Sequence, residues 1–283
     1  MYHSVIFEAV RDTNFDSDYE ILDGDKVVLT NLIKSVNTYD DWHIVPESRP
    51  LFLPPDMKTN YVDVPGTDGH ADFSDVLVGE VLYKTRTGSM EFIVLNDYQP
   101  WDILYSKIMN FLHGQKLRAY LEDDASYFYD GRFTVNKWRS EKQNSRIVID
   151  YDVTPYKRDK YSTLQRWLWD PFDFEGGVVR ELDQITVNGK TTVTIDGSRK
   201  SVIPRFVVSV TQGDHIDLTW SGLPGKVFPL RTTDVPSPTV DDYFYRYFNA
   251  MAKQPDIKIK DTTTTMTFTG YGTVGIFYRG GSL

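Results

Sequence analysis

Residues 58–95 combine a dense cluster of turn-forming residues with strand-like sequence on both sides. Residues 63–69 contain a Pro-Gly pair and an Asp-Gly pair, and both pairs favour tight turns. Residues 86–89 then lead into a run in which apolar side chains alternate with others, the pattern of a strand with one buried face. The apolar members of this run are Met90, Phe92 and Val94. This part of the chain is therefore predicted to fold as short strands joined by turns.

The length and composition favour two domains that are mainly β. A chain of 283 residues exceeds the usual size of one hydrophobic core. Hydrophobic residues make up 40% of the chain and aromatic residues 14%, which is ample for two cores. The pattern breaks near residue 155, where charged residues and later Pro and Gly follow one another. We expect a first domain at residues 1–155, a linker at 156–177 and a second domain at 178–283.

The residue content argues against several functions. The chain has no Cys, which excludes disulfides, thiolate nucleophiles and cysteine metal sites. Its net charge of −9 argues against a nucleic-acid ligand, because phosphate contacts need clustered Lys and Arg. No apolar run approaches the roughly 20 residues that span a bilayer, and residues 1–12 lack the layout of a signal peptide. We expect a soluble protein with no membrane partner that is not exported by the usual route.

The first domain is predicted to have an α+β fold. Apolar residues at spacings of three and four follow Pro100, and Gly114 comes after them, so a helix is predicted between these two residues, with Trp101 as its core anchor. The prolines between residues 35 and 55 predict an extended connection that Trp42 and Phe52 anchor. Strands are predicted at residues 4–10, 26–30, 116–121, 127–138 and 145–153, and Asp130-Gly131 is a turn signal inside the fourth.

The second domain is predicted to be a β-sandwich. Asn188-Gly189 lies between two strand-like segments and predicts a hairpin turn. Further strands are predicted at residues 202–210, 215–220 and 264–278, which suits a sandwich of about a hundred residues. Residues 237–253 instead have helical spacing and do not belong to the sandwich pattern. The apolar face of that helix would comprise Phe244, Tyr247, Phe248 and Met251.

Several motif-like patterns do not indicate a catalytic or ligand site. Residues 270–275 match G-x-G-x-x-G, but only eight residues follow, too few for the helix and strand of a dinucleotide site. Residues 12–18 carry Asp12, Asn14, Asp16 and Asp18 at the spacing of calcium ligands, yet a solvated loop explains them better, because Gly and Glu are absent at the sixth and twelfth positions. The histidines are scattered, and no nucleophile motif is present. We expect no catalytic residue, cofactor or metal, and no enzymatic activity.

Two tryptophans are candidates for glycan contact. Trp167 and Trp169 alternate, so both would lie on one side of a strand and could offer flat faces to a sugar. The same spacing is equally suited to burial, with both rings fastening the linker to a domain. Burial is the better first interpretation, and glycan contact stays the alternative.

Two segments resemble a known family of phage proteins. Residues 58–95, KTNYVDVPGTDGHADFSDVLVGEVLYKTRTGSMEFIVL, resemble the N-terminal domain of the distal tail proteins (Dit) of long-tailed phages and prophages of Gram-positive bacteria. Residues 264–283, TTMTFTGYGTVGIFYRGGSL, are similar to the closing strands of that family. The resemblance covers the first half of the chain and its end, whereas residues 156–260 match only in outline.

The resemblance implies a structural protein of the virion. Family members form hexameric rings that join the tail tube to the host-recognition apparatus, with a ring-forming first domain and a second domain of galectin-like shape. The implied partners are further copies of the chain, the tail tube protein, a tail-associated lysin or tail-fibre hub protein, and receptor-binding or baseplate proteins. The implied location is the tail tip, with assembly in the host cytoplasm.

Charged residues around the turn cluster are candidates for the ring contact. Four aspartates lie near Lys58, Lys84 and Arg86 in sequence, so opposite charges could meet across a head-to-tail boundary that closes into a ring. The residues predicted to contribute are Lys58, Tyr61, Asp63 and Arg86. Six copies would carry six times the charge of −9, and we expect an acidic bore that repels DNA.

Two other functions remain open at this point. The chain could be a carbohydrate-binding module that recognises cell-wall glycans on its own, in which case it would be a monomer in solution. It could also be an enzyme of the tail tip that cleaves cell wall, because many acids are present and a catalytic carboxylate pair is not excluded. No pair of carboxylates is singled out by the sequence.

Overall fold

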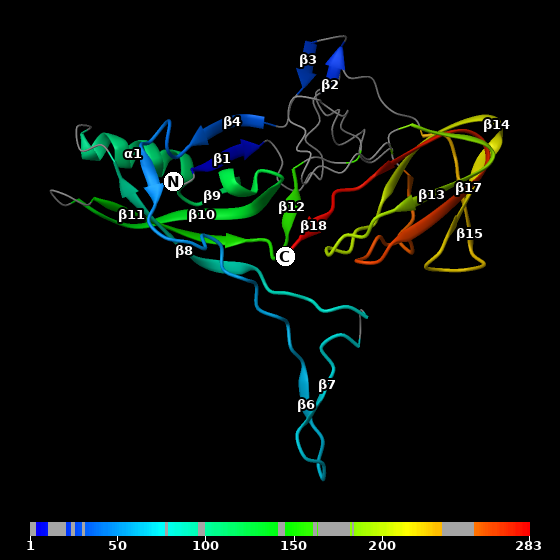
Figure 1. The fold of residues 1–283 in the computed structure, drawn as a ribbon, viewed down its shortest axis with the longest axis horizontal. Coiled ribbons are helices and arrows are strands. Elements are labelled where there is room, and N and C mark those ends of the chain that lie inside the picture. The colour runs from blue at the N-terminus through cyan, green and yellow to red at the C-terminus, as the bar shows by residue number, and fades with distance from the viewer. Residues whose placement is uncertain are drawn as a thin grey trace. The chain divides into compact units, whose positions relative to one another are not determined.

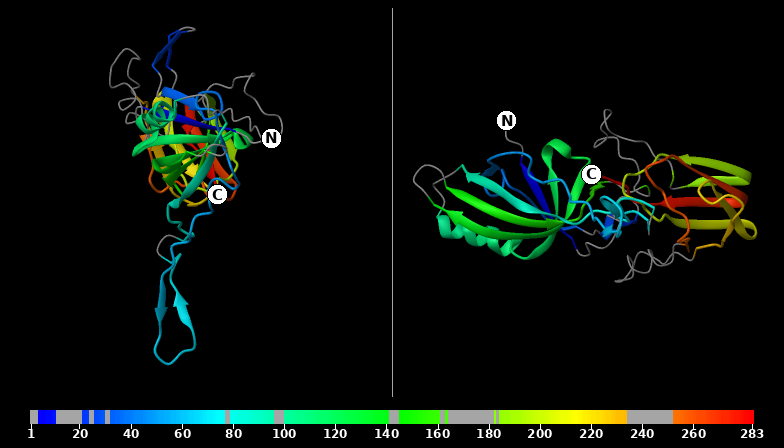
Figure 2. Two further views of the ribbon diagram at one scale, coloured as in Figure 1. Left: turned by 90° about the vertical axis from the view of Figure 1, so that its left-hand side faces the viewer. Right: turned by 90° about the horizontal axis from the view of Figure 1, so that it is seen from below.

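The chain divides into two compact units in the computed structural model. The model describes residues 4–10, 21–23, 26–29, 32–76, 79–95, 100–140, 145–160, 163, 182, 184–233 and 252–283. Unit 1 comprises Met1–Ala9, Lys34–Lys157 and Leu283, and unit 2 comprises Val10–Ile33 and Arg158–Ser282. Strands dominate both units (Figures 1 and 2), which confirms the mainly β fold.

The main sheet has nine strands, seven of which follow one another in the order β4-β1-β9-β10-β11-β8-β5, while β12 and β18 lie off this path. The pairs from β1 to β5 along this path are antiparallel. The strands are β1 (Val5–Val10), β4 (Leu32–Asn37), β5 (Ile44–Pro46), β8 (Arg86–Val94), β9 (Gln115–Leu121), β10 (Tyr127–Arg139) and β11 (Arg146–Val153). Strands predicted at residues 4–10, 116–121 and 145–153 are confirmed.

The predicted helix is confirmed as α1 (Trp101–Leu112). It begins directly after Pro100 and ends before Gly114, whose φ of 72° is the positive value that glycine adopts readily. Its buried residues Leu104, Ile108 and Leu112 share one core with the inner face of the sheet. Trp42 and Phe52 are buried in the same core, as predicted for the anchors of the proline-rich connection.

Strand β10 continues without interruption through Asp130-Gly131, so the predicted turn there is wrong. Gly131 pairs with Val153 on β11. A Cβ atom at Gly131 would lie 2.2 Å from the carbonyl oxygen of Asp152. Glycine is needed here because the neighbouring backbone approaches closely, which is a long-range reason that local sequence does not reveal.

Short elements complete the described chain. They are β2 (Ile21–Asp23) paired with β3 (Lys26–Leu29), β6 (Tyr61–Asp63) paired with β7 (His70–Asp72), the 3₁₀ turn η1 (Glu122–Asp124), and β12 (Lys157–Asp159) paired with β18 (Gly281–Ser282). The connection between β5 and β8 carries β6 and β7 away from the sheet edge (Figure 1).

Unit 2 is built on one five-stranded antiparallel sheet with the order β13-β17-β14-β15, and β16 also pairs with β14. The strands are β13 (Ile185–Ile195), β14 (Arg205–Trp220), β15 (Val227–Leu230), β16 (Ala252–Lys253) and β17 (Thr264–Phe277). The predicted strands at 202–210 and 215–220 form the single strand β14, which runs through Gly213.

The long strands of unit 2 bend so that their two halves face each other. Phe206 on β14 pairs with Ile276 on β17, eight residues from Phe268. In a straight strand eight residues span about 26 Å, but the rings of Phe206 and Phe268 lie 6.4 Å apart. The sheet therefore folds over its own core, and this fold gives the predicted sandwich its two layers.

Glycines permit this bend, and one of them shows that a predicted turn is wrong. Asn188-Gly189 is not a hairpin turn, because β13 continues through it and Gly189 pairs with Gly270. Residues 270–275 lie inside β17, where Gly272 has a φ of 150°. A Cβ atom there would lie 2.0 Å from the carbonyl oxygen of Ser209. The glycines at this spacing therefore allow β17 to bend close to β14.

Four predictions fall outside the described residues. They concern Trp167 and Trp169, the loop with Asp12, Asn14, Asp16 and Asp18, most of the linker at 156–177, and all but the last two residues of the helix at 237–253, which belong to β16 instead. They stay predictions.

Candidate assembly interface

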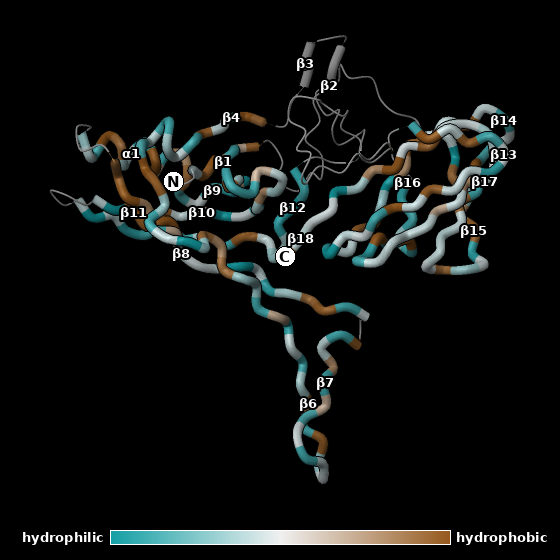
Figure 3. The backbone as a smooth tube through the Cα atoms, viewed as in Figure 1, coloured by the Kyte–Doolittle hydropathy of each residue, from teal (hydrophilic) through white to brown (hydrophobic). Residues whose placement is uncertain are grey.

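Residues 53–85 form a long exposed extension between β5 and β8, referred to here as the arm. Among its described residues none is buried. Nine of them are large, hydrophobic and exposed, and Figure 3 shows hydrophobic segments along the arm as far as its tip. They are Leu53, Met57, Tyr61, Val62, Val64, Phe73, Val76, Val81 and Leu82. Apolar surface of this extent without a core of its own is the mark of an interaction site.

The outer part of the arm is a two-stranded ribbon with two different faces. Tyr61 pairs with Asp72, and Asp63 pairs with His70, so these side chains share one polar face. On that face Asp63 lies 3.4 Å from the His70 ring nitrogen. Val62, Ala71 and Phe73 alternate with these residues and belong to the opposite, apolar face. Val62 is 45% exposed and Phe73 41% exposed, so none of the described residues covers this face.

Backbone hydrogen bonds keep the inner part of the arm together. The amide of Lys58 donates to the carbonyl of Leu82, and the amide of Lys84 donates to that of Asp56, both at 2.8 Å. Met57 and Tyr83 form an isolated bridge between these bonds. The arm is therefore two paired segments from its root outward.

The root of the arm, defined here as residues 49–53 and 83–86, is fixed by Phe52 in the core of unit 1. The Phe52 ring stacks on Tyr129 at a centroid distance of 4.0 Å and contacts Tyr151 edge-on at 4.9 Å. The next residue, Leu53, donates its amide to the Tyr151 hydroxyl at 2.8 Å. The chain thus passes from a buried aromatic cluster to the exposed arm within one residue.

Arg86 holds the returning end of the arm at the same place. Its Nε donates to the carbonyl of Pro155 at 2.7 Å, and its Nη1 donates to the carbonyl of Leu53 at 3.1 Å. The guanidinium also lies 5.5 Å from the centre of the Tyr129 ring. The side chain is buried, and this burial lowers the pKa of Arg86 below its usual value.

Replacing Arg86 by methionine should loosen the arm root. The change leaves the carbonyls of Leu53 and Pro155 without their charged donor, and the expected loss of unfolding free energy is about 1.5–3 kcal/mol. Urea unfolding measures it. Lys84→Met is the matched control, because Lys84 is an exposed cation two residues away. Equal effects of the two variants would contradict the role given to Arg86.

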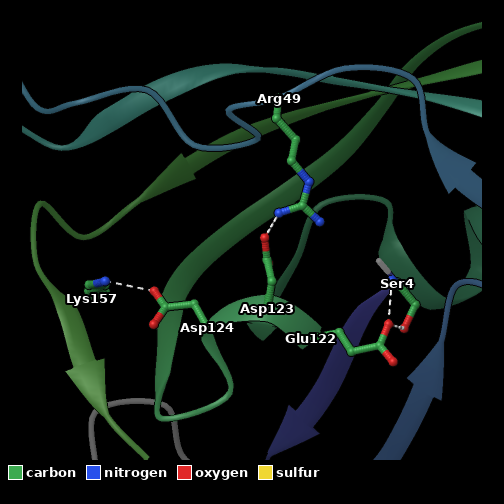
Figure 4. A network of polar contacts seen from close by, with 6 residues as sticks. All are labelled: Ser4, Arg49, Glu122, Asp123, Asp124 and Lys157. Atoms are coloured by element: carbon green, nitrogen blue, oxygen red, sulfur yellow. Dashed lines mark hydrogen bonds and ion pairs between the residues drawn. The ribbon is translucent and has the colours of Figure 1, made fainter. Parts of the chain in front are cut away.

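A turn of three consecutive acidic residues lies beside the arm root (Figure 4). Glu122 accepts hydrogen bonds from the amide of Ser4 at 2.8 Å and from its hydroxyl at 3.1 Å. Asp123 forms an ion pair with Arg49, on the connection that leads to the arm. Asp124 contacts the Nζ of Lys157 at 2.7 Å. Each carboxylate of η1 therefore holds a different segment of unit 1.

The phenols at the arm root should make unit 1 sensitive to alkali. Burial raises the pKa of Tyr129 and of Tyr151 above the ordinary value of 10. A raised pKa means that the unfolded chain releases these protons first, so stability is full below about pH 10 and is lost as the pH rises above it. Tyr129→Phe should flatten this decline in urea unfolding at pH 9 to 11. An unchanged slope would refute the assignment.

The structure separates the residues that the sequence grouped as ring contacts. Tyr61 and Asp63 share the polar face of β6, where both contact His70. Lys58 is exposed on the inner arm, whereas Arg86 is buried at the root and 5% exposed. A charge reversal at Arg86 would therefore disturb the fold of unit 1 as well as any ring. Their part in a ring stays a prediction.

Sequence reasoning missed two features of this region. One is the apolar face of the arm, although the alternation of Val62 and Val64 before the turn cluster and of Ala71 and Phe73 after it could have indicated it. The other is the acidic turn, whose only local signal is the run Glu122-Asp-Asp. Its partners are distant in sequence, so that run alone could not identify them.

Metal sites and membrane-spanning helices are absent from the described part of the chain. No group of three or more His, Asp or Glu residues there could hold a metal ion. Among those same residues, no helix is long and apolar enough to cross a membrane. His215 lies 2.5 Å from Asp214 and 3.4 Å from Asp217, and the three residues form a local charge cluster inside β14.

Comparisons with known proteins gave a match among solved structures. No protein-family model and no curated protein sequence matches the chain. The chain is similar to the Dit protein (gp 19.1) of phage SPP1, whose crystal structure is titled a paradigm of the hub adsorption apparatus in phages that infect Gram-positive bacteria. The match covers 84% of this chain and 98% of the SPP1 chain, with a TM-score of 0.49 and 14% identity.

Proposed function

We propose that this chain is a structural subunit of a phage tail, a distal tail protein without catalytic activity. Its copies would join into a hexameric ring between the tail tube and the host-recognition apparatus. The observation that carries the proposal is the arm, an extension at residues 53–85 that exposes an apolar face and has no buried residue among those described. The sequence resemblance supports it, because residues 58–95 comprise most of the arm together with β8.

The arm needs a partner for physical reasons. A two-stranded ribbon is marginally stable in water unless its apolar face packs against something. A protein interface of standard size uses about 20–30 residues on each side, which the arm alone could supply. A subunit that inserts an arm into its neighbour makes a head-to-tail contact, and such contacts close into a ring when the rotation permits.

Unit 2 would hold the other tail-tip components. Its strands fold into two layers around a core of their own, and this core is separate from that of unit 1. A unit with its own core can present a surface to adhesin or baseplate proteins while unit 1 forms the ring. The proposed location is the virion tail tip.

Electron microscopy of the purified full chain tests the proposal directly. We expect closed rings with a central opening. Incubating the same preparation with purified cell wall separates the other functions: a monomer that binds the wall would favour a carbohydrate-binding module. Release of soluble wall fragments would favour an enzyme of the tail tip, and either result would count against the structural role.

Substitutions on the two faces of the arm should differ in their effect on the oligomer mass. Val62→Asp places a charge on the apolar face and should lower the oligomer mass to that of fewer chains, because a buried unpaired charge is costly. Asp63→Asn, one residue away on the polar face, should leave the mass unchanged. Light scattering after size exclusion measures both. If only Asp63→Asn lowered the mass, the charged contact predicted from sequence would carry the ring.

A further inference from the structure

The root of the arm is tied to the segment by which the chain leaves unit 1. This exit segment, residues 154–157, ends unit 1 at Lys157. Arg86 donates to Leu53 at the start of the arm and to Pro155 in the exit segment, so one guanidinium joins both. Tyr83, on the returning strand of the arm, contacts the ring of Tyr156 edge-on at a centroid distance of 5.7 Å. Two successive residues of the exit segment therefore touch the arm root.

The acidic turn makes a second, separate connection between the same two regions (Figure 4). Asp123 pairs with Arg49 on the connection that leads into the arm, and Asp124 pairs with Lys157 in the exit segment. The two aspartates are neighbours in one 3₁₀ turn, so neither can shift far without the other. Glu122 ties that turn to Ser4 at the start of β1.

We expect the arm root and the exit segment to become ordered together because they share contact residues, not because the individual contacts are strong. The ion pairs are partly exposed, and single pairs of this kind contribute little to stability. However, Arg86 and η1 each contact both regions at once. Loss of order in one region removes the partners that the same residues use to hold the other.

We propose that the arm root and the exit segment form one cooperative unit, joined by Arg86 and by the acidic turn Glu122–Asp124. When the arm binds a partner, the exit segment that leads towards unit 2 becomes ordered as well. Coupling of this kind is reciprocal, so a partner that orders the exit segment through unit 2 also favours binding of the arm. A role of this cooperative unit in tail assembly rests on the proposed function. The coupling itself is a property of the single chain.

Amide hydrogen exchange on the full chain, at a concentration where it is monomeric, tests the coupling in both directions. Tyr156→Ala changes the exit segment and should speed exchange at the amides of Lys58 and Lys84 on the arm by about 5-fold or more, the lower end of usual coupling. Tyr83→Ala changes the arm and should speed exchange at the amide of Thr154, which donates to Asp130. Phe73→Ala, on the outer arm, should leave Thr154 unchanged.

A second measurement excludes a general loss of stability. Arg49→Ala and Lys157→Ala should each speed exchange at Lys84, and the double variant should depart from the product of the two effects, because both act through η1. Amides in the β13–β17 pair of unit 2 should not change. Independent effects of the two substitutions, or equal acceleration in unit 2, would overturn the proposal.

The outcomes also separate this proposal from the proposed function. A chain that forms no ring but shows the reciprocal exchange effects would refute the ring and leave the coupling standing. A chain that forms rings, and whose exit segment does not respond to Tyr83→Ala, would refute the coupling alone.

Discussion

Replacement of Phe52 by alanine is expected to lower the unfolding free energy of unit 1 by about 3–5 kcal/mol, the usual cost of removing a buried phenylalanine. Phe52 is 6% exposed and contacts the rings of Tyr129, Tyr151 and Phe133. Its removal leaves a cavity in the core and also frees the residue from which the arm starts. Urea unfolding followed by tryptophan fluorescence measures the loss.

Leu53→Ala is the matched control for that experiment. Leu53 is the next residue but is 48% exposed, so truncating its side chain should change stability by less than about 1 kcal/mol. Its backbone contacts with Tyr151 and Arg86 stay in place in the variant. A loss below about 1 kcal/mol for Phe52→Ala would show that the arm is not anchored as described.

Replacement of Gly272 by alanine is expected to destabilise unit 2 by about 3 kcal/mol or more, because backbone strain and overpacking act together. The backbone there has a φ of 150°, which side chains other than glycine rarely allow. The added Cβ atom would also lie 2.0 Å from the carbonyl oxygen of Ser209. Since Ser209 belongs to the neighbouring strand β14, relief requires the strands to separate at the bend.

Gly213→Ala separates the effect of backbone strain from that of overpacking. Gly213 also has a positive φ, 86°, but no atom lies within 4 Å of the position of its Cβ. This variant should lose about 1–2 kcal/mol from the backbone conformation alone. Thermal unfolding of both variants gives the comparison. Equal losses would mean that the close approach of β14 and β17 does not matter to the bend.

Local patterns were sufficient to predict the regular elements of unit 1. Helix α1 was predictable because its apolar spacing and both end signals, Pro100 and Gly114, lie within fifteen residues of sequence. Strands β9 and β11 were predictable from their apolar and β-branched residues. These signals come from neighbours in sequence, and the tertiary structure of unit 1 agrees with them.

Glycine was where local reasoning failed. Asn188-Gly189 and Asp130-Gly131 have the composition of hairpin turns, but both lie inside long strands. At Gly131 the reason is the carbonyl of Asp152 on the next strand, and at Gly189 it is a bend shared with Gly270. Both reasons come from strands far away in sequence, so the dipeptides could not reveal them.

The candidate interface was predictable in position but not in chemistry. The turn cluster at residues 63–69 marked the arm correctly, because turn residues act locally. The charged residues nearby suggested an electrostatic contact, yet Arg86 is buried at the root and an apolar face lies beside Asp63. Burial depends on what surrounds a residue in space, and residues 129, 151 and 155 around Arg86 are all distant in sequence.

The mass of the purified full chain in solution, measured by light scattering as the concentration rises, tests the central claim most directly. If the arm joins copies into a closed ring, the mass should rise to that of six chains and then stay constant, because a closed ring leaves no free arm to add further copies. A mass that remains that of one chain at the highest concentration reached would contradict the account.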